Sequence, residues 1–80
     1  MSKRAYTILL HPDLEDGGYA VTVPALPGCV TQGETLEEAI SMAREAIALH
    51  IEGLIETGRP VPEGDAGAQA VTIEVETFAA

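Results

Sequence analysis

Hydrophobic positions change their spacing several times along the chain, and the first part has the spacing of β-strands. Residues 5–11 form a short apolar run that stops at Pro12, and residues 19–23 alternate, with every second side chain large and apolar. Residues 29–32 form a third short segment after a turn that contains two prolines and a glycine. Runs of this length and pattern predict strands. Because the connections are too short for a parallel crossover, we expect the three strands to be antiparallel.

The spacing becomes helical in the middle of the chain. Thr35 followed by Glu38 matches a capping box, in which the two side chains accept hydrogen bonds from free backbone N–H groups of the first turn. Gly58 and Pro60 are typical of the residues that follow a helix end. The pattern therefore predicts one long helix over residues 36–57. Its apolar stripe consists of Leu36, Ala39, Ile40, Ala43, Ile47, His50, Ile51 and Leu54.

Alternation returns near the end of the sequence. Val71, Ile73 and Val75 occupy every second position of residues 70–78, after a linker over residues 61–69. This pattern predicts a fourth strand. A strand–helix–strand connection within one sheet is right-handed, so we expect this strand to lie parallel to the first.

The expected order is β-β-β-α-β in an α+β fold. Residues 1–80 are long enough for one small domain, with a four-stranded sheet and one long helix on one face. No second helical pattern follows residues 70–78, so we expect no C-terminal DNA-binding domain in this sequence.

Charge and composition exclude several classes of function. Thirteen acidic residues against four lysines and arginines give a net charge of −9, which argues against nucleic-acid binding by this chain alone. Hydrophobic residues make up 46% of the chain, which favours a packed core over a disordered acidic tail. The sequence has no apolar run of membrane-spanning length and no signal-peptide pattern. With Cys29 as its only cysteine, the protein is expected to be cytoplasmic.

Four glutamates recur on one arc of the predicted helix, opposite its apolar stripe. They are Glu38, Glu45, Glu52 and Glu56. Such a ridge is a candidate docking surface for a basic partner. The alternative is a solvated face without a partner, which is the usual meaning of a charge run.

A second group of residues suggests an oligomer. Leu9 and Ala20 are expected on the outer face of the sheet, and Met42 and Leu49 beside the apolar stripe of the helix. One helix cannot cover both faces of a sheet, so these side chains are candidates for a homo-oligomer interface, most simply that of a dimer. The alternative is ordinary scattered surface apolarity.

The residues favour no enzyme and no cofactor or metal site. A two-metal nuclease needs clustered carboxylates, and residues 5–10 of the first strand contain no acid. Neither histidine has a serine or cysteine placed to complete a nucleophilic triad.

Two motifs carry a resemblance to a known family. The segment Pro24-Ala-Leu-Pro-Gly-Cys29 and the helix start Gly33-Glu-Thr-Leu-Glu-Glu-Ala39 are similar to those of the HicB family of antitoxins. The resemblance implies a partial, degenerate ribonuclease H fold without nuclease activity. It also implies a partner, a small basic mRNA-cleaving toxin of the HicA type, whose active site the antitoxin masks. The alternative is a stand-alone homo-oligomeric module, regulatory or ligand-binding, without a toxin.

Overall fold

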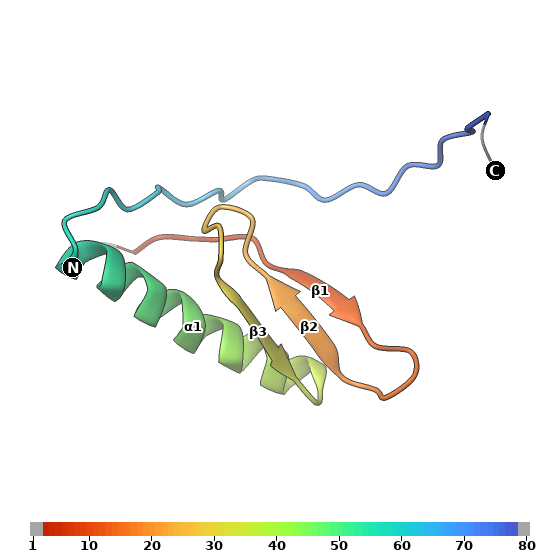
Figure 1. Ribbon diagram of the computed structural model, residues 1–80, viewed down its shortest axis with the longest axis horizontal. Helices are drawn as coiled ribbons and strands as arrows, with labels where there is room; N and C mark the ends of the chain where they lie inside the picture. Colours follow the sequence, from red (N-terminus) through yellow and green to blue (C-terminus); the bar gives the residue numbers. More distant parts are fainter. Residues whose placement is uncertain (1–2, 79–80) are drawn as a thin grey trace.

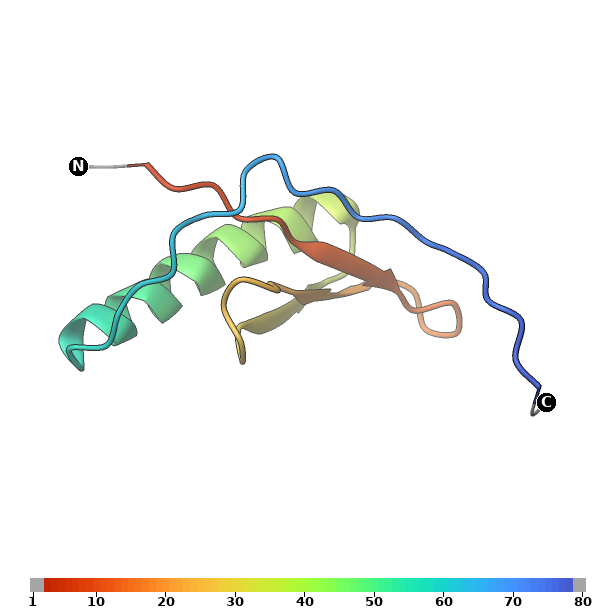
Figure 2. The ribbon, with the colours of Figure 1, turned by 90° about the horizontal axis from the view of Figure 1, so that it is seen from above.

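The computed structural model describes residues 3–78 and contains three strands and one helix (Figure 1). The elements are β1 (Leu9–Pro12), β2 (Tyr19–Thr22), β3 (Val30–Gly33) and α1 (Leu36–Glu56). The strands form one antiparallel sheet in the order β1-β2-β3. α1 lies across one face, mostly against β3 and β2 (Figure 2). The α+β class, the antiparallel meander and the long helix are confirmed.

The core lies between α1 and the inner face of the sheet. Leu10 pairs with Val21, and both side chains face the helix, where Ala39 and Ala43 are fully buried. The small side chains of these alanines allow the helix backbone to approach the sheet closely. A second cluster continues the core towards the end of the helix, and it consists of Val23, Leu26, Cys29 and Leu54.

The proline-rich turn between β2 and β3 places one leucine in this core. The N–H of Leu26 donates to the carbonyl of Val23 at 2.9 Å, and the N–H of Cys29 donates to the carbonyl of Leu26 at 2.9 Å. Gly28 has a φ of 87°, which a residue with a side chain rarely adopts. The Leu26 side chain is 0% exposed. The motif of residues 24–29 is therefore a folding element that inserts Leu26 beneath the helix.

The start of α1 is capped as the sequence predicts. The Thr35 hydroxyl accepts a hydrogen bond from the Glu38 N–H at 3.1 Å, and a Glu38 carboxylate oxygen accepts one from the Glu34 N–H at 3.1 Å. Both bonds satisfy N–H groups that have no partner inside the helix.

Loss of this cap is expected to weaken the fold without abolishing it. Thr35→Ala removes the hydroxyl acceptor and should lower the free energy of unfolding by about 1 kcal/mol. Urea denaturation followed by circular dichroism measures this change. Thr35→Ser, which retains the acceptor, serves as the control and should behave nearly as the wild type does. Equal losses in both variants would contradict the capping role.

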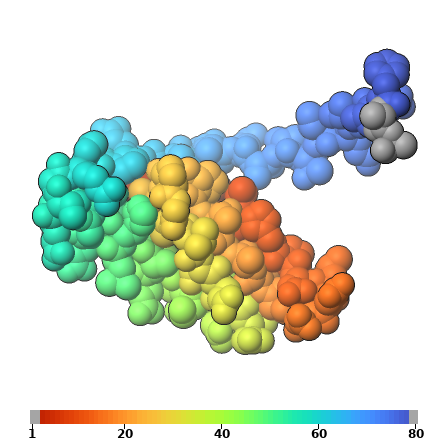
Figure 3. Space-filling model, viewed as in Figure 1, coloured from red at the N-terminus to blue at the C-terminus, as the bar shows by residue number. Residues whose placement is uncertain are grey.

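The predicted fourth strand is wrong: the sheet has three strands, not four. Residues 70–77 are extended but lie outside the sheet, and the chain runs away from the body of the molecule (Figures 1 and 3). The long axis is 48 Å against 29 and 23 Å for the others, and the radius of gyration is 15.1 Å. A compact chain of this length would have a radius of gyration of about 12 Å.

The route of the chain after α1 explains this departure. The Asp65 N–H donates to the carbonyl of Ala5 at 2.8 Å, and an Asp65 carboxylate oxygen accepts a hydrogen bond from the Thr7 N–H. This contact occupies the segment before β1. The first strand begins at Leu9 instead of residue 5 because its partner β2 ends opposite it at Thr22, and the chain then turns at Pro24. A turn follows, in which Gly67 has a φ of 93° and the Ala68 N–H donates to the Asp65 carbonyl. Residues after this turn do not continue along β1, so no parallel pairing forms.

Candidate functional site

The outward face of α1 carries one continuous stripe of acidic and apolar residues. Its members are separated alternately by four and three positions, a spacing that places them on one side of a helix. We call this surface the exposed helix stripe, and it consists of Glu38, Met42, Glu45, Leu49, Glu52 and Glu56. The Met42 side chain is 38% exposed and that of Leu49 is 62% exposed. The glutamates and the helix apolar pair, which were predicted to form two separate groups, therefore share one surface.

The glutamates of the stripe differ in their hydrogen bonding. Glu38 is committed to the helix cap through its bond to the Glu34 N–H. Within residues 3–78, no hydrogen bond or ion pair engages the carboxylates of Glu45, Glu52 and Glu56, all of which are exposed. These three are available to a partner without the loss of an internal contact.

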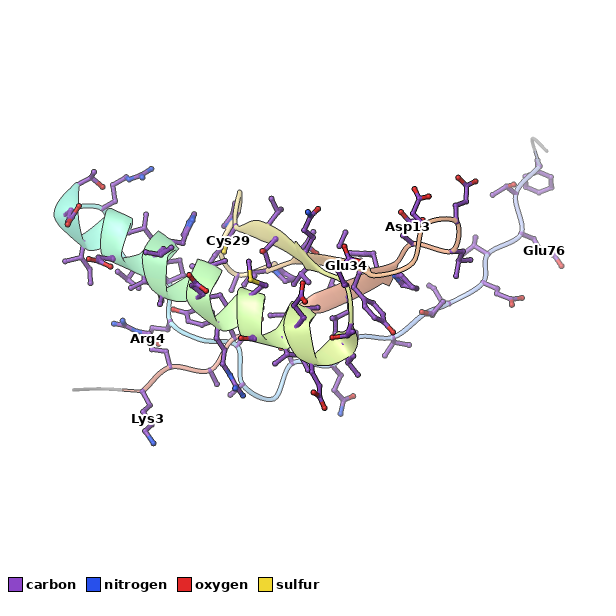
Figure 4. All side chains as sticks on the ribbon, turned by 90° about the horizontal axis from the view of Figure 1, so that it is seen from below. Lys3, Arg4, Asp13, Cys29, Glu34 and Glu76 are labelled. Atoms are coloured by element: carbon purple, nitrogen blue, oxygen red, sulfur yellow. The ribbon has the colours of Figure 1, made fainter. Side chains whose placement is uncertain are left out.

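Two arginines lie together at one hollow of the molecule, and Arg59 lies just after the end of α1, where its Nε donates to the Thr57 hydroxyl. Arg4 and Arg44 line a common hollow of about 460 Å³, together with Tyr6 and Ile51. Figure 4 shows Lys3 and Arg4 on the segment before β1, away from Asp13 and Glu34. The exposed helix stripe contains no basic residue, so it presents a uniformly negative potential with two apolar side chains inside it.

The two sheet residues of the expected oligomer interface lie on the other side of the molecule from the exposed helix stripe. Leu10 and Val21 face the helix, so their neighbours Leu9 and Ala20 project from the outer face of the sheet. Ala20 is exposed and Leu9 is half-buried. Because Leu9 and Ala20 are on the sheet and Met42 and Leu49 are on the helix, one flat contact cannot bury all four.

A hollow of about 280 Å³, which the sequence pattern did not predict, lies where the first hairpin meets the start of α1. Asp13, Glu34 and Glu38 line it together with Gly18 and Gly33. N–H groups of Asp16 and Glu15 donate to the Asp13 carboxylate and lower its pKa. No group of three acidic, histidine or cysteine residues in the described part of the chain is placed to hold a metal ion. Two glycines in succession, at residues 17 and 18, are the feature of the sequence that could have indicated this close approach of the first hairpin to the start of α1.

Cys29 is a core residue and is not placed for chemistry. Its side chain is buried, and this burial raises the pKa of its thiol. Both effects reduce the fraction of reactive thiolate that a reagent can reach.

We expect Cys29 to react slowly in the folded protein. The rate with a thiol-specific disulfide reagent should be at least about tenfold lower than in denaturant, since the reaction requires local opening of the core. The control is Thr72→Cys, which places a second thiol at an exposed position. This variant should show one fast and one slow reacting group. Two fast groups would contradict the burial of Cys29.

None of the helices found in residues 3–78 is long and apolar enough to cross a membrane.

Comparisons with known proteins identify the family. Residues 6–77 match the family model described as HicB-like antitoxin of bacterial toxin-antitoxin system. The UPF0150 protein ssr1765 of Synechocystis sp. is 53% identical over 60 residues, which cover 75% of each protein. Antitoxin HicB 1 of Photorhabdus laumondii is 40% identical over 57 residues, which cover 71% of this chain and 36% of that antitoxin.

A solved structure supports the same assignment. The N-terminal domain of the Burkholderia pseudomallei antitoxin HicB superposes with a TM-score of 0.66 at 36% sequence identity. The match covers 90% of this chain and 98% of that domain. The resemblance found in residues 24–29 and 33–39 is thereby confirmed. The chain belongs to the family of HicB-like antitoxins of bacterial toxin–antitoxin systems.

Proposed function

We propose that this chain is an antitoxin that binds a small basic toxin of the HicA type, which cleaves mRNA, and neutralises it by masking its active site. The observation that carries the proposal is the exposed helix stripe, in which three unengaged carboxylates and two exposed apolar side chains lie on one rigid helix. Family membership supplies the class of partner.

The stripe has the composition expected of a surface that binds a basic protein. Carboxylates at Glu45, Glu52 and Glu56 attract a positive partner over long range and exclude acidic proteins. Met42 and Leu49 supply apolar area that a partner can cover, and methionine adapts to irregular surfaces. From Glu38 to Glu56 the stripe is about 27 Å long, which is enough to cover the active site of a small toxin.

The mechanism we propose is stoichiometric binding in the cytoplasm, without catalysis by this chain. The exposed helix stripe lacks a nucleophile, and its acidity repels RNA. It therefore opposes the toxin by occupying the surface that RNA needs. Operator DNA is not expected to bind to this chain alone, because its four lysines and arginines do not form a continuous path for a phosphate backbone.

The alternative of a stand-alone homo-oligomeric module without a toxin is less favoured. The family model and the HicB relatives all point to an antitoxin.

Co-expression with the product of the neighbouring gene tests the proposal. We expect a short basic protein to co-purify with this chain in equal amounts, and we expect its expression alone to arrest growth. Growth should recover when this chain is produced with it. Growth arrest that persists despite production of folded antitoxin would overturn the proposal.

A further inference from the structure

Residues 70–78, here called the C-terminal arm, expose an unusual amount of apolar surface for an extended segment. Val71, Ile73 and Val75 are 75, 74 and 71% exposed. They occupy alternate positions, so all three project from one side of the arm, while Thr72 and Glu74 project from the other. This is the pattern of a strand that is buried on one face. The arm therefore has the sequence of a strand and, in the isolated chain, no sheet to join.

The same molecule contains an unfilled place for a strand. β1 is paired only with β2, so its other edge is open within the described sheet. The part of this edge before β1 already makes backbone contacts, because Asp65 binds Ala5 and Thr7. Those contacts end at Asp65, and the edge at Leu9–Pro12 stays uncovered. An open edge of this kind is a template for pairing with another strand.

The chain does not direct its own arm onto this edge. The turn at residues 65–68 points the arm outward, and Figures 1 and 2 show it extending past the end of the sheet. One molecule therefore displays both a donor strand and an acceptor edge that it does not combine.

We propose that the C-terminal arm inserts beside β1 of a second copy of this chain, and that two copies exchange arms reciprocally. Donor and acceptor on one chain are self-complementary, which is the requirement for a twofold symmetric dimer. The free edge of β1 is four residues, or about 13 Å, long, so each half of the exchange pairs about four residues of the arm with it. The proposal does not depend on the identity of any toxin.

Electrostatic repulsion between the two copies opposes the exchange and makes it depend on salt concentration. Each copy has a net charge of −9, so two copies repel each other. Added salt screens this repulsion and leaves apolar burial and backbone pairing in place. The dimer should therefore strengthen as salt is raised.

Light scattering coupled to size exclusion tests the exchange with the full chain. At tens of micromolar and moderate salt, we expect a mass of twice 8.4 kDa. Ile73→Glu places a charge on the apolar side of the arm and should return the mass to that of the monomer. Thr72→Glu adds the same charge on the other side and should leave the dimer intact. Because both residues are exposed, circular dichroism should show an unchanged fold in both variants.

A second measurement locates the contact. In a mixture of isotope-labelled and unlabelled chains, nuclear Overhauser effects between copies should connect Val71, Ile73 and Val75 with β1. A monomeric wild type, or a dimer that Ile73→Glu leaves intact, would overturn the proposal. So would a dimer whose arm contacts another element, or a monomer in which Ile73→Glu weakens only toxin binding.

Discussion

Gly33→Ala is expected to lower the free energy of unfolding by about 3 kcal/mol, a large part of the stability of a domain this small. A Cβ atom at Gly33 would lie 2.4 Å from the backbone nitrogen of Ala39 and 2.6 Å from its Cα. Both neighbours belong to the helix backbone, which cannot move aside as a flexible side chain does. The substitution therefore forces α1 away from β3, and with it the buried alanines of the core.

A second glycine supplies the matched control. Gly53 lies within α1, and a Cβ atom there would meet nothing within 4 Å. Gly53→Ala should raise stability by about 0.5–1 kcal/mol, because alanine is the better helix former. Urea unfolding of both variants gives the comparison. If both were destabilised equally, the close approach at Gly33 would not be the cause.

The double variant Glu45→Lys/Glu52→Lys is expected to weaken toxin binding at least about 100-fold, or about 2.7 kcal/mol. Each substitution replaces an attraction to the basic toxin with a repulsion. Glu38 is left unchanged because it also caps the helix. Both substituted side chains are exposed, so the fold should be unaffected.

The control for this variant is Glu15→Lys/Asp16→Lys in the first hairpin loop. Both positions are exposed, and the loop lies at the other end of the molecule from the end of α1 (Figure 1). The net charge changes by the same amount, so general electrostatic attraction falls equally in the two variants. Isothermal titration calorimetry should show near-normal affinity for the hairpin variant. Equal losses in both would mean that net charge, and not the stripe, determines binding.

The sequence predicted the elements whose signals are local. The cap at Thr35 and the terminating Gly58 and Pro60 are short-range features, and α1 ends within one residue of the expected position. The three strands are joined by tight turns that leave few alternatives. Each of these predictions depended on neighbours within a few residues.

The prediction of a fourth strand was wrong because alternation of apolar and polar residues shows only that a segment is able to pair. Whether residues 70–78 do pair depends on an edge elsewhere and on the turn after Asp65, which directs them away. The position of each side chain around the helix, in contrast, could be predicted from the sequence spacing alone. Met42 and Leu49 fall between the glutamates at intervals of four and three, but grouping residues by chemistry separated them into two surfaces.

Inhibition of RNA cleavage tests whether this chain masks the active site of the toxin. Purified toxin from the neighbouring gene would be mixed with a defined RNA and titrated with this chain. We expect cleavage to fall in proportion to added antitoxin and to stop when the two proteins reach a fixed small-integer ratio. We also expect the Glu45→Lys/Glu52→Lys variant to require a large excess for the same effect. Cleavage that continues undiminished in the presence of excess folded wild-type chain would show that the chain does not mask the active site.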